Sequence, residues 1–238
     1  MDIEKTRCPN CPNHCAYPGM CTLGMSFFDR MKRNGIKDGV IYIHGKGGNA
    51  QEADFYKPLF AECDVVGLDY KAEYPWDAIS EFLPFFDEFY KSHKSVTVVA
   101  NSIGAYFSML SLPQDKIKKA YFISPIVNME KLIENMLIWA GKTESDLKAE
   151  KAIPTNFGET LYWDYLTWVR SNPVKWSVPT VIIRGENDNM QSFETIKDFA
   201  DDTDSKVFVM ENGEHWFHTD EQMEFIKDVI DKTRLDIK

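Results

Sequence analysis

Short apolar runs and longer amphipathic segments alternate along most of the chain. Six runs rich in Val, Ile and other large apolar residues have the length and composition of buried β-strands, at 40–44, 63–68, 95–100, 119–123, 180–184 and 205–210. Between and after them, apolar residues recur at helical spacing over 51–62, 76–93, 103–112, 193–201 and 220–235. This alternation predicts an α/β fold of about six mostly parallel strands with helices on both faces of the sheet.

Residues 125–176 interrupt the alternation between the fourth and fifth predicted strands. Two stretches, 129–139 and 159–170, have helical patterns, and the polar segment 142–150 joins them. Because this excursion leaves the sheet at the carboxyl ends of its strands, we expect it to form a helical cap over that edge. Ordinary packing of helices on the sheet accounts for most of its Trp and Tyr residues.

The first 24 residues differ in composition from the rest of the chain. Four cysteines lie within fourteen residues of one another: Cys8, Cys11, Cys15 and Cys21. The segment has too few large apolar side chains to bury a core, so the spacing predicts a closed structural metal site, with zinc ahead of an iron–sulfur cluster. A mobile tail of free thiols is the alternative. We therefore expect a Cys-rich segment at 1–24 and a single domain at 25–238.

Composition and charge restrict the classes of function. A chain of 238 residues with 44% hydrophobic residues suits one soluble globular domain with a small appendage. Its formal net charge of −10 argues against nucleic acids and anionic membrane surfaces as partners. No apolar run has the length of a membrane span, and the first residues lack the pattern of a signal peptide. We therefore expect a cytoplasmic protein.

The main chemical motif, Ala100-Asn101-Ser102-Ile103-Gly104, follows the third predicted strand. A sharp turn from strand to helix lifts a serine above the sheet edge, and it needs small residues two positions to either side. The same turn leaves the N–H of Ile103 at a helix N-terminus, where it can face a developing oxyanion. Taken alone, this stretch is equally typical of a serine that caps a buried helix.

Three further polar sites also follow predicted strands. The first is the Gly-rich loop 44–48, in which the N–H of Lys46 is a candidate second oxyanion donor. This loop does not match the nucleotide-binding patterns. Asp188 follows the fifth strand and His215 the sixth. A serine hydroxyl needs a base near neutral pH, and the base needs a carboxylate to orient it, so Ser102, Asp188 and His215 together supply a nucleophilic site.

These four sites together resemble the α/β-hydrolase superfamily, over roughly residues 39–238. The resemblance implies the α/β-hydrolase fold and gives each candidate a role: Ser102 as nucleophile, Asp188 as acid, His215 as general base, and Lys46 with Ile103 as oxyanion donors. Two features depart from the family pattern. Ala100 stands in place of the commoner glycine, and the first two strands of the usual sheet have no counterpart, which makes this chain a compact variant.

The resemblance and the residues together lead to an expected activity. We expect a carboxylesterase-like serine hydrolase that cleaves small-molecule esters with a small to medium apolar acyl group through an acyl-enzyme, without a cofactor. Thioesterase, amidase and carbon–carbon bond hydrolase activities use the same triad and stay open. The alternative from another class is a non-catalytic binding protein on the same scaffold.

Overall fold

A computed structural model of the protein describes residues 36–234, and the four cysteines of the predicted metal site lie outside this range. Its central sheet has six strands, and every pair of neighbours is parallel. In spatial order the strands are β2 (Asp64–Leu68), β1 (Gly39–Ile43), β3 (Val96–Asn101), β4 (Ile117–Ile123), β7 (Thr180–Gly185) and β8 (Lys206–Met210). The predicted six-stranded parallel sheet is confirmed, with each strand within two residues of its expected bounds.

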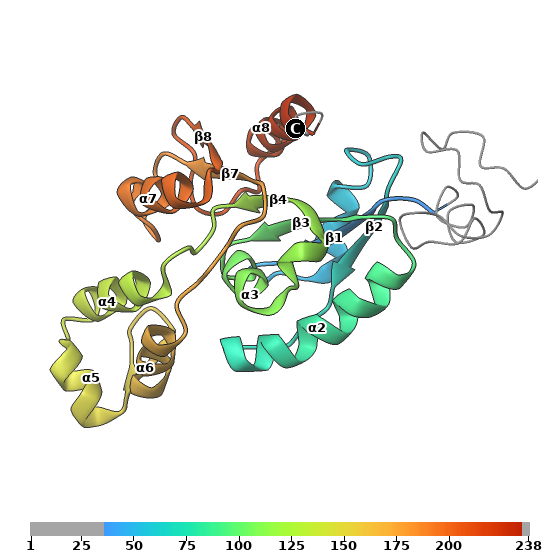
Figure 1. Cartoon of the computed structure of the whole chain (residues 1–238). Helices are drawn as coiled ribbons and strands as arrows, with labels where there is room; N and C mark the ends of the chain where they lie inside the picture. Colours follow the sequence, from blue (N-terminus) through green and yellow to red (C-terminus); the bar gives the residue numbers. More distant parts are fainter. Residues whose placement is uncertain (1–35, 235–238) are drawn as a thin grey trace, which may run out of the picture.

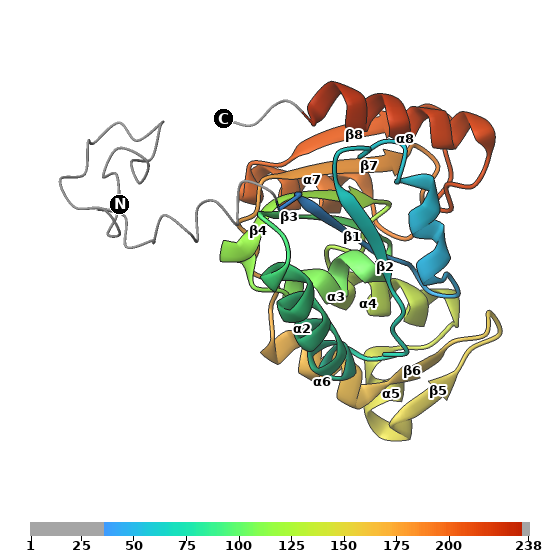
Figure 2. The same cartoon turned by 90° about the vertical axis from the view of Figure 1, so that its right-hand side faces the viewer.

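Helices cover both faces of the sheet. Alternate residues of each strand point to opposite faces, so each strand contributes to two buried cores. In β1, Ile41 belongs to the same buried core as Phe82 of α2, whereas Tyr42 belongs to the core that contains Ile230 of α8. Figures 1 and 2 show α2 and α3 on one side of the sheet and α8 on the other. The α-helices outside the segment between β4 and β7 are α2 (Pro75–Lys91), α3 (Ile103–Ser111), α7 (Phe193–Thr203) and α8 (Asp220–Thr233).

The predicted helix over 51–62 is wrong in its length. The structure has a short 3-10 helix, η2 (Ala50–Phe55), followed by turns. Asn49 caps η2, because its side-chain oxygen accepts a hydrogen bond from the N–H of Gln51. In return, the N–H of Asn49 donates to the carboxylate of Glu52. Pro58 has no N–H to donate, so it disfavours a helix that would continue through 51–62.

The cap lies between β4 and β7, as expected, but two of its predicted elements need correction. Helix α4 (Met129–Trp139) agrees with the expected range. The segment 142–150, expected to be a polar connection, contains α5 (Glu144–Glu150), because Thr143 and Asp146 form a capping box at its start. The predicted helix over 159–170 begins later, as α6 (Trp163–Ser171). The residues before it form an antiparallel pair, β5 (Ala152–Pro154) and β6 (Thr160–Tyr162), which turns at Gly158 with φ 88°.

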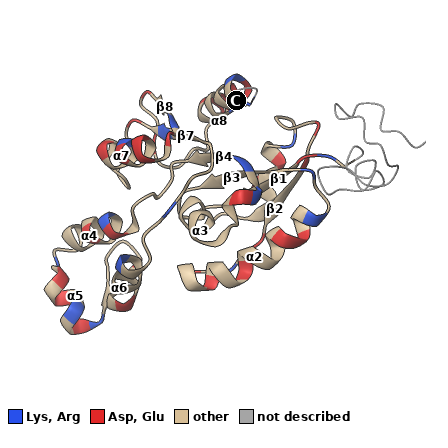
Figure 3. Ribbon diagram, viewed as in Figure 1, with Lys and Arg blue, Asp and Glu red and all other residues tan. Residues whose placement is uncertain are grey.

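Ionic contacts at the surface join the three cap helices. Arg170 of α6 donates from Nε to Glu130 of α4 at 2.6 Å and from Nη1 to Glu144 of α5 at 2.7 Å. Figure 3 shows acidic and basic residues together on the cap helices. All three side chains are about one-third or more exposed, so water screens these contacts.

Candidate active site

Ser102 occupies a sharp turn between β3 and α3. Its backbone has φ 51° and ψ −120°, a conformation that residues with a side chain rarely adopt. The N–H of Ser102 donates to the carbonyl oxygen of Ile123 in β4 at 2.9 Å, and α3 begins at the next residue. Gly104 allows this close packing, because a Cβ there would lie 2.4 Å from the carbonyl oxygen of His44. The turn therefore places Ser102 at the carboxyl edge of the sheet.

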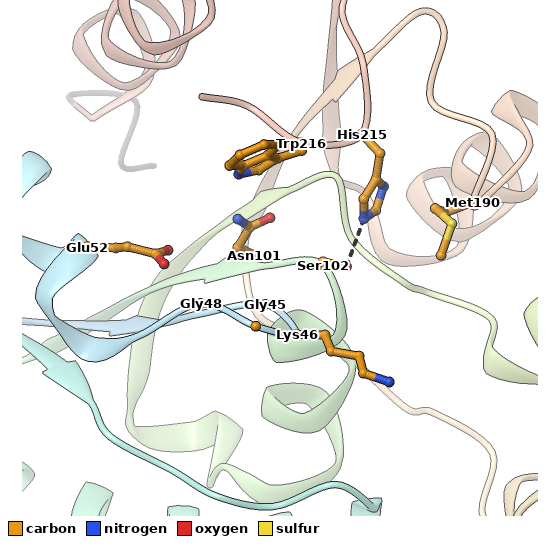
Figure 4. Close-up of a pocket in the computed structure, with 10 residues that line it drawn as sticks. Gly45, Lys46, Gly48, Glu52, Asn101, Ser102, Met190, His215 and Trp216 are labelled. Atoms are coloured by element: carbon orange, nitrogen blue, oxygen red, sulfur yellow. Dashed lines mark hydrogen bonds between the residues drawn. The ribbon is translucent and has the colours of Figure 1, made fainter. Parts of the chain in front are cut away.

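The structure brings Ser102, His215 and Asp188 into one hydrogen-bonded chain. Ser102 Oγ lies 2.8 Å from His215 Nε2, and His215 Nδ1 lies 2.9 Å from Asp188 Oδ1. Figure 4 shows the imidazole directed at the serine. The Asp188 side chain is only 3% exposed, whereas that of His215 is 24% exposed. With a proton on Nδ1, the imidazole donates to the carboxylate and accepts from the serine hydroxyl at Nε2.

The loops that carry the acid and the histidine contact each other directly. The N–H of Asn187 donates to the carbonyl oxygen of Gly213 at 2.8 Å. The N–H of Glu186 donates to the carbonyl oxygen of Met210 at 2.9 Å. A Cβ at Gly185 would lie 2.3 Å from the carbonyl carbon of Gly213, so only glycine fits at position 185. The two loops therefore hold Asp188 and His215 at a fixed separation.

Arg184 supports the acid, and sequence analysis did not identify it. The side chain is buried, and its Nη2 donates to the carbonyl oxygen of Asp188 at 3.0 Å. Burial lowers the pKa of the Arg184 guanidinium, and the negative charge of Asp188 counteracts this shift. The N–H of Met190 donates to Asp188 Oδ1 at 2.9 Å. A basic residue in the otherwise apolar strand β7 was the signal available in the sequence.

The two nearest competitors for the acid and the histidine lie elsewhere. Glu186 is exposed and accepts the N–H of Asn212 at 3.0 Å, so it braces the histidine loop from outside. His218 is exposed, and its Nδ1 lies 2.8 Å from the carbonyl oxygen of Trp216. In the part of the chain that the structure describes, neither side chain forms a hydrogen bond with Ser102 or His215.

A cavity of about 370 Å³ opens beside the serine. Its lining consists of Gly45, Lys46, Gly47, Gly48, Glu52, Asn101, Ser102, Met190, His215 and Trp216. Within residues 36–234, the N–H groups of Lys46 and Ile103 donate to no protein acceptor. Lys46 is part of the cavity wall, whereas Ile103 follows Ser102 at the start of α3 and is not part of it.

The side chain of Lys46 joins the cavity wall to the cap. Its Nζ donates to both carboxylate oxygens of Glu159, at 2.5 Å for Oε1. Glu159 lies in the turn between β5 and β6, so this ion pair links the glycine-rich loop to the cap hairpin. The lysine side chain is 67% exposed and the glutamate side chain 32%.

Over residues 36–234, no three His, Cys, Asp or Glu side chains are grouped so that they can hold a metal ion. No helix in the same range has both the length and the apolar character that crossing a membrane requires. The predicted metal ligands Cys8, Cys11, Cys15 and Cys21 lie outside the described residues, so that site stays a prediction.

Solved structures provide the comparison, since no family model and no curated protein matches the sequence. Est1E from Butyrivibrio proteoclasticus is 16% identical, with 84% of this chain and 88% of that chain covered and a TM-score of 0.68. The mouse α/β hydrolase domain-containing protein 10 is 13% identical, with 84% and 90% covered and a TM-score of 0.68. A putative hydrolase from Agrobacterium vitis S4 is 14% identical, with 85% and 88% covered and a TM-score of 0.64. At these identities the likeness concerns the fold.

Proposed function

We propose that this chain, which has the α/β-hydrolase fold, is a serine hydrolase that cleaves carboxylic esters. The observation that carries the proposal is the hydrogen-bonded chain from Ser102 through His215 to Asp188, with distances of 2.8 and 2.9 Å. Its three members follow the ends of three strands and meet at one edge of the sheet. A binding protein has no use for a nucleophile, a base and an orienting acid in this arrangement.

The proposed reaction has two steps. Ser102 Oγ attacks the ester carbonyl while His215 Nε2 takes its proton, and the buried carboxylate of Asp188 stabilises the resulting imidazolium. His215 then returns the proton to the leaving alcohol, which leaves an acyl group on Ser102. A water molecule, deprotonated by His215, releases the acid in the second step. The N–H groups of Lys46 and Ile103 are the proposed oxyanion donors, and one such donor is typically worth a factor of about 10²–10³ in turnover.

For the acyl group we propose a small to medium apolar chain. Met190 supports this choice, because it supplies an apolar side chain to the cavity next to His215 (Figure 4). Est1E, with a TM-score of 0.67 to this chain, has been solved with ferulic acid bound, and a carboxylic acid is the class of product that the proposed ester hydrolysis would release. Thioesters stay an alternative substrate, since the same triad cleaves them and a thioesterase domain from the curacin biosynthetic pathway has a TM-score of 0.50 to this chain.

A fluorophosphonate probe, combined with esters of graded acyl length, tests the proposal. The wild-type protein should be labelled and active, whereas Ser102→Ala should be unlabelled and lose a factor of about 10⁴–10⁶ in turnover. Ser80→Ala, which changes an exposed serine on α2, is the matched control and should behave as wild type. A thermal melt should show that both variants fold. An unlabelled wild type, or an active Ser102→Ala, would favour the non-catalytic binding protein.

A further inference from the structure

The cavity beside Ser102 has one charged side chain without an ionic partner. Lys46 and Glu52 are the two residues of its wall that carry a formal charge at neutral pH. The charge of Lys46 is matched by Glu159, which takes both hydrogen bonds from its Nζ. Within residues 36–234, no Lys, Arg or His forms an ion pair with Glu52. The cavity therefore presents an uncompensated negative charge.

Two neutral donors hold the Glu52 carboxylate in place. The N–H of Asn49 donates to Oε1 at 2.9 Å, and the hydroxyl of Tyr42 donates to Oε2 at 2.5 Å. Burial raises the pKa of Tyr42 above its ordinary value, so this hydroxyl stays protonated and remains a donor. Neither contact cancels the charge of the carboxylate. Each oxygen retains a lone pair for a further donor, so Glu52 is a fixed anion at the wall of the cavity.

An aromatic ring accompanies this anion. Trp216 is 66% exposed, although it follows His215 directly and lines the same cavity. The ring stacks on His218 with centroids 4.0 Å apart, which orients the indole. In Figure 4, Glu52 and Met190 lie on opposite sides of Ser102, and Trp216 lies on the Glu52 side. A carboxylate and an indole face are the two protein groups that attract an ammonium ion most strongly.

We propose that the substrate is an ester whose alcohol portion carries a positively charged ammonium group, recognised by its charge. The ammonium group would lie between Glu52 and Trp216, the carbonyl at Ser102, and the acyl group toward Met190. This inference rests on the proposed function and adds the charge of the substrate to it. The net charge of −10 also favours a cationic substrate, because it attracts cations to the protein and repels anionic esters.

A matched pair of esters isolates the charge of the substrate. Butyrylcholine and 3,3-dimethylbutyl butyrate have nearly the same shape and differ in a single atom, a quaternary nitrogen in place of a carbon. The wild type should hydrolyse the cationic ester with a kcat/KM about tenfold higher. Glu52→Gln should reduce this preference by about three- to tenfold, with little change for the neutral ester. Glutamine serves equally well at this position of a capping box, so the variant should fold.

Two controls separate the local effect from general electrostatics. Glu62→Gln removes the same charge from an exposed residue outside the cavity and should keep the wild-type preference. Trp216→Leu should reduce the preference while Glu52 is intact, because leucine has no π face. Raising the ionic strength from about 0.02 to about 0.5 M should weaken the preference in the wild type itself. The salt dependence shows that the preference is electrostatic, and the comparison of Glu52→Gln with Glu62→Gln assigns it either to the cavity or to the net charge. Trp216→Leu provides the local test where Glu52→Gln fails to fold.

The outcomes distinguish this inference from the proposed function. A wild type that the fluorophosphonate labels, but that hydrolyses both esters equally well, would overturn the inference alone. An equal loss of both activities in Glu52→Gln, with the salt dependence absent, would overturn it as well, because Glu52 would then serve the fold. A wild type that is neither labelled nor active on either ester would defeat both proposals together.

Discussion

The carboxyl edge of the sheet and the cap are held together by different interactions. At the sheet edge, the loops after β7 and β8 are joined by backbone hydrogen bonds, such as the one from Asn187 to Gly213 at 2.8 Å. Asp188 lies in this region with a side chain only 3% exposed. In the cap, ion pairs between exposed side chains, such as Arg170 with Glu144 and Lys46 with Glu159, add to buried apolar contacts and to the backbone hydrogen bonds of β5 and β6.

This difference separates two tasks of the molecule. Backbone hydrogen bonds between adjoining loops leave the chain little freedom to move, so they fix the proposed catalytic side chains tightly. Exposed ion pairs typically contribute only about 0–1 kcal/mol, so the cap tolerates their exchange. We therefore expect substitutions at the sheet edge to abolish turnover. Substitutions in the cap contacts should change KM and leave kcat nearly unchanged.

The largest effect should come from the proposed base. His215→Ala should reduce turnover by about 10⁵–10⁶, because the serine then has no proton acceptor. His218→Ala should keep most of the activity, since within residues 36–234 the His218 ring stacks on Trp216 and its Nδ1 contacts the Trp216 carbonyl oxygen, with no hydrogen bond to Ser102 or His215. Steady-state kinetics on both variants, with a melt to verify folding, measures this contrast. An active His215→Ala beside an inactive His218→Ala would reverse the assignment of the base.

Replacing the proposed acid, Asp188, should reduce turnover somewhat less than replacing His215. Asp188→Asn keeps the shape of the side chain but removes the charge that orients His215, so turnover should fall by about 10⁴. Glu186→Gln changes an exposed residue two positions away and should cost about threefold at most. The same assay compares the two variants. If Glu186→Gln is the more damaging change, the acid lies two residues earlier than proposed.

The link between the cap and the glycine-rich loop should have a modest effect. Glu159→Gln removes the ion pair with Lys46 and should raise KM about two- to fivefold, with kcat nearly unchanged. Glu150→Gln is the matched control, because it removes a different cap ion pair, with Lys142, that does not touch the cavity. Separate measurement of kcat and KM tests the contrast. A large loss of kcat in Glu159→Gln would show that this contact positions the catalytic loop itself.

Metal removal should have the smallest effect. If Cys8, Cys11, Cys15 and Cys21 bind a structural metal, the purified protein should contain about one equivalent of zinc or iron. Chelation should then leave ester hydrolysis unchanged, because no step of the proposed mechanism uses a metal. Metal analysis of protein prepared without a metal-binding tag, followed by assays before and after chelation, measures both. Loss of hydrolysis on chelation would mean that the cysteine segment shapes the active site.

The strands and the ends that carry the site could be predicted from the sequence because their signals are local. The run from Val96 to Ala100 has the composition of a buried strand, and Ala100 and Gly104 leave room for the sharp turn around Ser102. His215 could be placed for the same reason, since it follows a strand at a glycine. The parallel sheet then brings these separate strand ends to one edge.

The features that could not be predicted depend on packing between distant segments. Glu52 was part of a predicted helix, and only the packing of η2 beside the glycine-rich loop brings it to the cavity. The hydrogen bond from Arg184 to the Asp188 backbone likewise depends on the path of the loop after β7. In the cap, the pairing of 152–154 with 160–162 overrides a weak helical pattern, because Gly158 turns the chain back on itself.

The hydrogen bond between Ser102 and His215 joins residues that are 113 positions apart in the chain. Closing so long a loop costs conformational entropy, and contacts between distant residues generally form late in folding. The histidine also follows β8, which is an edge strand of the central sheet and the last of its strands in the chain. A nascent or partly refolded chain can therefore bury much of its core before the proposed triad is complete. The rate at which hydrolytic activity returns after denaturation would then report the rate at which this last strand joins the sheet, and not the rate of the earlier collapse.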